Sequence, residues 1–273
     1  MERPAWAPPG IDISMPSVSR MYDFYLGGSH NFEVDRQAAR RAMEFLPGLP
    51  KVVQANRAFM RRAVRYAAGQ GITQFIDVGA GLPTPGGDRT VHEVALRADP
   101  DARVLYIDHD PVVVAHARAV LEEEPRAAVA HADLRRPRQI LDSPELAGLL
   151  DLRRPVALLL LSVLHFVEDA DDPHGAVARL RDAFAPGSLI VVNHAAYDGV
   201  PVPEEQAARA VGVYRDIRQP LTMRTHDRIA GFFEGYDMTE PGLVSPPRWR
   251  PDAPAEQEDP YAFAGFAGVG RKA

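Results

Sequence analysis

The 273-residue sequence contains no cysteine. This absence excludes disulfide bonds, thiolate zinc sites, cysteine nucleophiles and iron–sulfur clusters. Lysine is also scarce, because Lys51 and Lys272 are the only two, and arginine supplies nearly all of the positive charge. The formal net charge of -6 argues against an extended nucleic-acid backbone as the main partner, since such binding depends on clustered basic residues. No nucleic-acid partner is therefore expected.

The sequence has no segment typical of secretion or of membrane insertion. Its first ten residues, MERPAWAPPG, contain no apolar core of a signal peptide. The longest apolar stretch, Val156 to Val167, is too short to cross a bilayer. The nine histidines form no HExxH pattern or other short ligand set, so no metal is expected. We expect a cytoplasmic protein without a membrane partner, either a monomer or a homodimer.

From residue 74 onward, the sequence alternates between apolar runs typical of strands and segments with helical spacing. Alternating strands and helices imply right-handed crossovers and a parallel sheet. The apolar runs are continuous, which indicates that helices cover both faces of this sheet. Strands are predicted at 74–79, 103–108, 128–133, 155–166 and 188–195, and helices at 91–98, 112–123, 143–151, 174–184, 204–217 and 225–235.

Three helices are predicted ahead of this alternation. The first is expected to begin near Ser14, as its N-cap, and to end at Gly27 and Gly28. The others are expected at 33–45 and at about 51–68. The chain is therefore expected to contain two units, an N-terminal helical extension or lid at 1–70 and an α/β domain at 71–273.

The first predicted strand ends in the sequence QFIDVGAGLPT, with Asp77, Gly79 and Gly81 at its carboxyl end. In an open α/β sheet ligands bind at the carboxyl ends of the strands. A tight turn without a ligand is the alternative for the two glycines. A dinucleotide fingerprint would place a third glycine at Thr84, and Pro83 removes a backbone donor that a pyrophosphate would use. The turn therefore favours an uncharged or zwitterionic ligand.

Acidic residues also follow the next two predicted strands. Asp108 at the end of the second strand can accept hydrogen bonds from ribose hydroxyls, whereas Asp110 is assigned to capping the next helix ahead of a proline. Asp133 after the third strand can accept a hydrogen bond from an adenine amino group, or it can cap a turn. Leu134 offers an apolar surface to the adenine ring, and Ser162 after the fourth strand lies at the same rim.

This order of motifs resembles the class I S-adenosylmethionine-dependent methyltransferases. In that family the first motif is an acid–x–Gly–x–Gly turn, matched by Asp77, Gly79 and Gly81, and Asp108 and Asp133 match the second and third motifs. The segments SVSRMYDFYLGGSHNFEVDR, ANRAFMRRAVRY and FIDVGAGLPT are similar to an actinobacterial family of such enzymes long catalogued as a domain of unknown function. With these segments the resemblance spans nearly the whole chain.

The resemblance implies a Rossmann-like, mostly parallel sheet of seven strands with helices on both faces. The antiparallel C-terminal hairpin of that fold fits 236–244 and 263–272. The resemblance also implies S-adenosyl-L-methionine as the cofactor and transfer of its methyl group to an oxygen or nitrogen of a small molecule, such as a secondary metabolite. One departure from the pattern is the segment PGGD after Thr84, which lengthens the first turn.

His165 and Tyr25 are the candidate catalytic residues. His165 follows the fourth strand and has the side-chain pKa of about 6.5 that suits a general base; its alternative is a buried histidine satisfied by a backbone carbonyl. His194, after the fifth strand, is a second candidate base, or a solvated loop residue. Tyr22 and Tyr25 lie one helical turn apart and are expected to close over the cofactor, unless they only pack in the core.

Three further residues complete the expected cofactor site. Arg57 is expected to pair with the cofactor carboxylate, or alternatively with a surface acid. Asn31 is expected to contact the methionine end, and His109, next to the strand-end acid, is included with the cofactor-binding residues. Two other functions stay open at this point: a catalytically inactive S-adenosylmethionine-binding or sensor protein, and a nicotinamide oxidoreductase.

Overall fold

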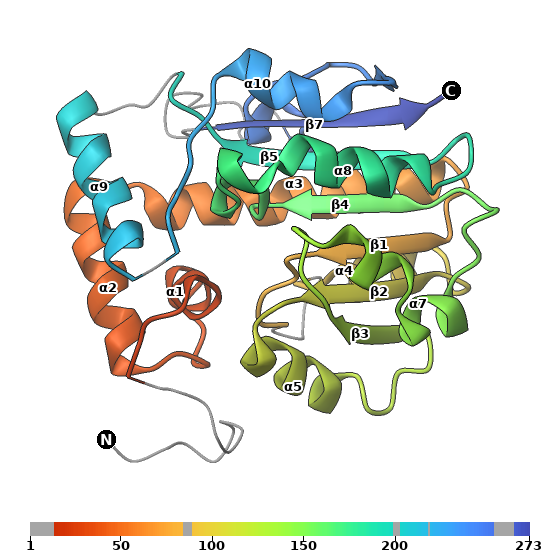
Figure 1. Ribbon diagram of the computed structural model, residues 1–273, viewed down its shortest axis with the longest axis horizontal. Coiled ribbons are helices and arrows are strands. Elements are labelled where there is room, and N and C mark those ends of the chain that lie inside the picture. Colours follow the sequence, from red (N-terminus) through yellow and green to blue (C-terminus); the bar gives the residue numbers. More distant parts are fainter. Residues whose placement is uncertain (1–13, 84–88, 199–202, 218, 254–264) are drawn as a thin grey trace.

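A seven-stranded sheet forms the centre of the computed structural model, which describes residues 14–83, 89–198, 203–217, 219–253 and 265–273 (Figure 1). The strand order is β3-β2-β1-β4-β5-β7-β6. The first five strands are parallel to one another, and β7 runs antiparallel to both β5 and β6. The strands are β1 Gln74–Val78, β2 Arg103–Asp108, β3 Ala127–His131, β4 Ala157–Leu161, β5 Leu189–Ala195, β6 Tyr236–Met238 and β7 Gly265–Lys272.

Helices cover both faces of the sheet, because successive side chains along each strand point to opposite faces. On one face Phe75 and Val104 pack against α3, α4 and α5. On the other face Ile76 and Leu105 pack against α6, α7 and α8. The predicted fold class is therefore confirmed. The helices are α1 Val18–Tyr25, α2 Glu33–Phe45, α3 Leu49–Gly69, α4 Val91–Ala98, α5 Pro111–Val120, α6 Pro137–Leu141, α7 Pro144–Leu149, α8 Pro173–Asp182, α9 Glu204–Asp216 and α10 His226–Ala230.

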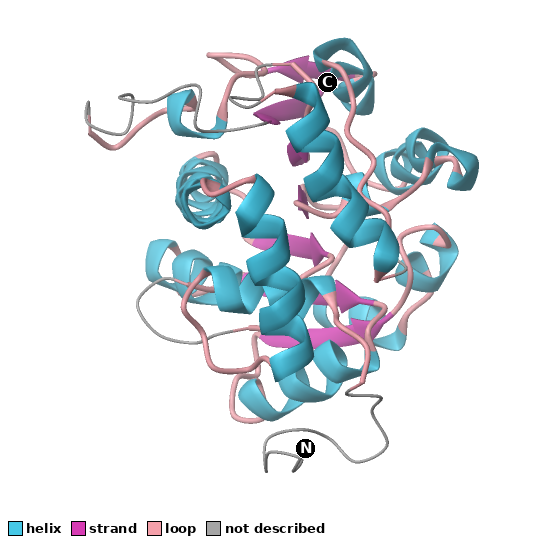
Figure 2. Ribbon diagram, turned by 90° about the vertical axis from the view of Figure 1, so that its left-hand side faces the viewer, coloured by secondary structure: helices cyan, strands magenta, loops and turns pink. Residues whose placement is uncertain are grey.

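A third layer of helices lies beside the carboxyl ends of the parallel strands. Figure 1 shows α1, α2 and α9 on this side, and in the perpendicular view of Figure 2 helices lie in front of the strands. Met21, Tyr25 and Ala39 form a separate apolar core there with Val213 and Tyr214 of α9. The helical layer thus combines the N-terminal helices with a helix that comes much later in the sequence.

The first helix begins three residues later than expected. Ser17, not Ser14, holds the N-cap position of α1, and its side chain caps no helical N–H group. Instead its backbone N–H donates to Asp35 Oδ1 at 2.9 Å, and Arg20 Nε donates to Asp35 Oδ2 at 2.8 Å. Phe32 N–H donates to the same carboxylate at 2.7 Å. This buried carboxylate therefore joins α1 to the start of α2, and the expected N-cap is corrected.

The strand order reverses between β1 and β4, since β2 and β3 lie on one side of this pair and β5 on the other. Ligands in open α/β sheets bind at such a switch point, beyond the carboxyl ends of the strands. Here the helical layer stands over that point. Among the described residues, no helix combines the length and the apolar character that spanning a membrane requires.

Candidate active site

The glycine turn after β1 lies at the switch point and is shaped by two close contacts. Gly79 has a φ of 73°, and its N–H donates to Ile107 O at 2.8 Å. A Cβ atom at this position would lie 2.3 Å from Val163 Cγ2, just beyond β4. Gly81 also has a positive φ, of 65°, and its N–H donates to Asp108 Oδ2 at 3.0 Å. The glycines thus let the turn approach both neighbouring strands.

The two glycines provide a matched pair of substitutions. Gly81→Ala introduces only an unfavourable φ, because no atom lies within 4 Å of the added Cβ, and we expect it to lower the free energy of unfolding by about 1 kcal/mol. Gly79→Ala adds the clash with Val163, and we expect a loss of about 3 kcal/mol. Urea unfolding measures both. Equal losses would show that the close approach to Val163 is unimportant.

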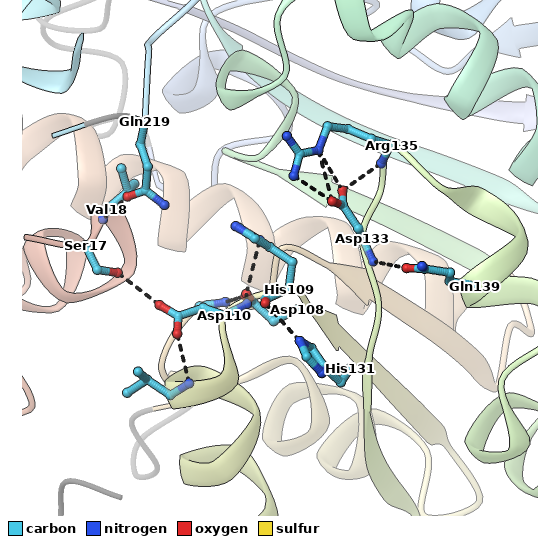
Figure 3. A network of polar contacts seen from close by, with 12 residues as sticks. Ser17, Val18, Asp108, His109, Asp110, His131, Asp133, Arg135, Gln139 and Gln219 are labelled. Atoms are coloured by element: carbon cyan, nitrogen blue, oxygen red, sulfur yellow. Dashed lines mark hydrogen bonds and ion pairs between the residues drawn. The ribbon is translucent and has the colours of Figure 1, made fainter. Parts of the chain in front are cut away.

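Asp108 at the end of β2 is buried and ordered by backbone donors. Its Oδ1 accepts a hydrogen bond from Asp110 N–H at 2.9 Å, and its Oδ2 accepts the bond from the glycine turn. Burial raises its pKa, while the two backbone N–H groups act in the opposite direction. Asp110 caps α5 by accepting from Val112 N–H at 2.8 Å, as predicted. It also accepts from Ser17 Oγ at 3.2 Å, which ties α1 to this strand end (Figure 3).

Asp133 follows β3 at the outer end of a cleft that begins at the glycine turn, and this outer end shares Gly79, Asp108 and His109 with the rest of the cleft. The Asp133 carboxylate is already paired. Arg135 donates to both carboxylate oxygens, at 3.0 Å from Nε and 2.6 Å from Nη2 (Figure 3). The pair is partly exposed, so opening it requires little free energy. Leu134 and His109 line this outer end together with Asp133. An adenine amino group could bond to Asp133 only by displacing Arg135 from the carboxylate or by sharing the carboxylate with it.

The central cleft, which runs from the glycine turn to α1, also contains Asp77, Arg57 and Tyr22. Asp77 is buried at the end of β1, and burial raises its pKa to about 7, while Arg57 lowers it and Asp108 raises it further. The Arg57 guanidinium lies 5.2 Å from the centre of the Tyr22 ring. Arg57 Nε is buried and has no hydrogen-bond partner among the described residues. This donor fits a carboxylate ligand in the cleft.

The raised pKa of Asp77 predicts a specific pH dependence of stability. Between about pH 4 and pH 7 the native state holds a proton on Asp77 that the unfolded chain releases, so this group's contribution to stability falls as pH rises. Asp77→Asn removes that effect. We expect the free energy of unfolding of Asp77→Asn, relative to the unsubstituted protein, to rise by on the order of 3 kcal/mol from pH 4.5 to pH 8. Denaturant titrations at several pH values test this, and parallel pH profiles would contradict it.

Asn31 does not lie in the central cleft. Its side-chain nitrogen donates to Asp23 Oδ2 and to Gly28 O, and its side-chain oxygen accepts from Arg36. All of its polar atoms are therefore used within the loop between α1 and α2. The expectation that Asn31 contacts a ligand is corrected: it orders Asp23, which does line the cleft.

Asn56 and Asn193, which were not predicted as site residues, bond to the predicted Ser162 at the wall between the central cleft and a neighbouring apolar cavity. Ser162 after β4 has a φ of 56°, a left-handed conformation that is rare for a side-chain-bearing residue. Its N–H donates to Asn193 Oδ1 at 2.5 Å, and Asn56 Nδ2 donates to its Oγ at 3.2 Å. Asn56 directly precedes the predicted site residue Arg57 in the ANRAF segment. This position next to Arg57 is the only sequence feature that could have marked Asn56 as a site residue. These three residues fix the strained end of β4.

An apolar cavity lies on the other side of this wall. Val18, Tyr22, Asn56, Ser162 and Phe166 border both the central cleft and the apolar cavity. Most of the remaining lining is aliphatic or aromatic, from the end of α2, from α3, from α9 and from the segment after α9: Leu46, Leu49, Val52, Val53, Ala207, Val211, Tyr214, Leu221 and Met223. The arrangement places a polar cleft next to a space suited to an apolar molecule.

Both candidate catalytic residues line the apolar cavity, but His165 is not arranged as a base. The N–H of Ala195 donates to His165 Nδ1 at 3.3 Å, so the ring carries its proton on Nε2. Burial, and then His194 and Arg224, hold the pKa of His165 well below its usual range. The lone pair that a base would use is therefore engaged, and the general-base role expected from the sequence does not fit. His165 presents a donor instead.

His194 is fully engaged in the structure. Its Nδ1 lies 2.6 Å from Ala195 O, and its Nε2 accepts from Arg224 Nη1 at 2.8 Å. Burial is the main cause that lowers the pKa of His194 to about 3. It is neither a base nor a solvated loop residue. Tyr25 faces Tyr214 in the cavity wall, with 3.2 Å between the two hydroxyl oxygens.

Comparisons with known proteins show the family to which this chain belongs. The family model described as S-adenosyl methyltransferase matches residues 4–273. A crystal structure of a candidate methyltransferase from Thermobifida fusca YX is 39% identical, with a TM-score of 0.90 over 98% of this chain and 99% of that chain. A DUF574 family protein from Streptomyces avermitilis MA-4680 is 36% identical, with a TM-score of 0.90 over 96% of this chain and 99% of that one. No curated protein matches.

The fold and these matches define an S-adenosylmethionine-dependent methyltransferase, with S-adenosyl-L-methionine as its cofactor. The chain belongs to the S-adenosyl methyltransferase family. A more distant structure, an O-methyltransferase family protein from Burkholderia thailandensis, is 14% identical with a TM-score of 0.50 over 87% of this chain and 63% of that chain, and it shows the fold alone.

Proposed function

We propose that this enzyme transfers the methyl group to an oxygen or nitrogen atom of a small, largely apolar molecule that binds in the apolar cavity. The observation that carries the proposal is the shared wall of Val18, Tyr22, Asn56, Ser162 and Phe166 between the cleft and the cavity. A cofactor in the central cleft would reach an acceptor only across this wall. The cavity has too few charged residues to suit a phosphate or another highly charged acceptor.

The residues of the central cleft fit the cofactor in the order that the sequence predicts. We assign the ribose hydroxyls to Asp108 and the adenine to Asp133, Leu134 and His109 at the outer end of the cleft. Asp108 keeps acceptor capacity, because each carboxylate oxygen carries two lone pairs and only one backbone N–H group bonds to each. The adenine assignment requires the Arg135 pair to open or to share its carboxylate.

The methionine end of the cofactor is assigned to the other end of the cleft. Arg57, with its unpartnered buried Nε, would hold the carboxylate beside Tyr22. Asp77, Gly79 and Gly81 line the inner side of the same cleft, and Ser162 lies at its border with the cavity.

Bound S-adenosylmethionine supplies the methyl group and its leaving group, so the protein's task is to bind, orient and exclude water. Tyr22 and Ser162 border both spaces and would hold the acceptor in line with the methyl carbon. We propose that the N-terminal segment 1–70 acts as a lid over the border between the central cleft and the apolar cavity, and that 71–273 forms the methyltransferase domain. Two of the bonds that hold α1 join this segment to 71–273: Ser17 Oγ to Asp110, and Val18 N–H to Gln219 Oε1 at 2.8 Å.

Filling the apolar cavity tests the proposal. Ala207 of α9 lines the cavity, while its neighbour Ala208 is exposed and does not. Ala207→Trp should leave the dissociation constant of S-adenosylhomocysteine unchanged within twofold and abolish methyl transfer to a panel of phenols and amines. Ala208→Trp is the control and should keep both properties. A parallel loss of S-adenosylhomocysteine binding in Ala207→Trp would show that the two spaces are not separate sites.

A further inference from the structure

The described lining of the apolar cavity presents hydrogen-bond donors and no group that can act as a base, which bears on the kind of acceptor it takes. His165 is only 8% exposed and lines the cavity. Because a backbone N–H group occupies Nδ1, neither the cation nor the Nδ1–H tautomer fits the ring. Its Nε2–H group has no acceptor among the described residues. A ligand in the cavity can therefore supply the acceptor for this donor.

The tyrosine pair in the cavity wall provides a second donor. Tyr25 and Tyr214 are both buried, and burial raises the pKa of both phenols, so both keep their protons at neutral pH. One hydroxyl donates to the other across 3.2 Å. The remaining hydroxyl proton has no acceptor in the part of the chain that the structure describes. The Phe166 ring packs against both residues, with its centre 4.5 Å from that of the His165 ring and 5.9 Å from that of the Tyr214 ring.

The other polar groups around the cavity do not provide a base. Asn56 and Asn193 are bonded to Ser162, and both nitrogens of His194 are engaged. No aspartate or glutamate is among the lining residues that the structure describes. The charged group behind this wall is Arg224, which is 2% exposed and bonds to His194. It is paired with Asp169 at 2.7 Å, so it provides no base either.

We propose that the acceptor is a compound with an acidic hydroxyl group, a phenol or an enol, whose oxygen anion is held by the Nε2–H group of His165, with the Tyr25–Tyr214 hydroxyl pair as a further donor lining the same cavity. This inference rests on the proposed function. Neutral donors in an apolar site stabilise an oxyanion strongly, because little competing water is present. A neutral amine acceptor would gain nothing from these donors, because its nucleophilic nitrogen carries no negative charge for them to stabilise.

The reaction balances without a protein base. The acceptor hydroxyl loses its proton to water, and the resulting oxyanion forms a bond to the methyl carbon while the carbon–sulfur bond breaks. The sulfur keeps the bonding electron pair, so the products are a methyl ether and neutral S-adenosylhomocysteine. His165 contacts the reacting oxygen as a donor and does not change its own protonation.

A spectroscopic titration tests the inference. The probe is 4-nitrophenol, whose phenol and phenolate forms absorb at different wavelengths, added to the protein saturated with S-adenosylhomocysteine. The unsubstituted protein should bind the phenolate about tenfold more tightly than His165→Phe does, as expected for one hydrogen bond to a charged group. His165→Gln keeps a donor near the ε position and should retain most of this affinity. His226→Phe, outside the cavity, is the control and should match the unsubstituted protein.

Three results of this titration would overturn the inference. Equal phenolate affinity in His165→Phe, binding of the neutral phenol alone, or no binding of the probe would contradict the donor role. If S-adenosylhomocysteine binds and the probe does not, this inference fails and the methyltransferase proposal stands; if S-adenosylhomocysteine itself does not bind, both fail. Nitrogen-15 NMR of the unsubstituted protein gives an independent check, since a His165 ring protonated at Nδ1 would overturn it whatever the variants do.

Discussion

Replacing Arg224 with methionine is expected to lower the free energy of unfolding by about 3 to 5 kcal/mol. Its guanidinium donates to Leu164 O at 2.9 Å, to Val167 O at 2.8 Å and to His194 Nε2 at 2.8 Å. It also pairs with Asp169 at 2.7 Å. Methionine fills similar space but leaves three buried acceptors without a donor, and each unsatisfied acceptor costs about 1 to 3 kcal/mol. Guanidinium chloride unfolding at pH 7 measures the loss.

Arg228 provides the matched control because it pairs with the same carboxylate, Asp169, at 3.0 Å. Its side chain is 55% exposed, so Arg228→Met should change the free energy of unfolding by no more than about 0.5 kcal/mol. The difference between the two variants then reports the buried bonds of Arg224 and excludes the shared ion pair. Similar losses in both would contradict the importance of those bonds.

Asp108→Ala is expected to weaken the binding of S-adenosylmethionine by about 100-fold. The ribose would lose two hydrogen bonds to a charged acceptor, and bonds of that kind contribute about 1.5 to 3 kcal/mol each. The glycine turn would also lose the acceptor for Gly81 N–H. Isothermal titration calorimetry measures the dissociation constant, and circular dichroism confirms that the variant is folded.

Asp101→Ala serves as the control for charge removal, since Asp101 is exposed and precedes the same strand. The dissociation constant of S-adenosylmethionine for Asp101→Ala should stay within twofold of that for the unsubstituted protein. An unchanged dissociation constant in Asp108→Ala would refute the ribose role, whatever the control shows.

Much of the fold followed from local sequence signals. Helices α2 and α4 begin and end where predicted, because apolar spacing, polar first turns and a following proline or glycine define them. The strand-end residues Asp77, Asp108 and Asp133 were found because parallel strands bring their carboxyl ends to one edge. The short helix α6 was missed, since five residues are too few to show a period.

The rest depended on contacts between distant parts of the chain. The packing of α9 beside α2, and the bond from Gln219 to the start of α1, join segments about 200 residues apart, and no local pattern predicts them. The role of His165 reversed for the same reason, because its proton position is set by the N–H group of Ala195 on another strand. A histidine at position 165 suggested a side chain that titrates near neutral pH. In the structure, burial and the backbone N–H of Ala195 make His165 a neutral hydrogen-bond donor.

A crystal structure of the protein with S-adenosylhomocysteine is the most direct test of the site as a whole. It should place the ribose on Asp108, the amino-acid end between Arg57 and Asp77, and the sulfur beside Ser162, facing the apolar cavity. A sulfur atom directed away from that cavity, or a ligand bound outside the cleft between α1 and the glycine turn, would contradict the account.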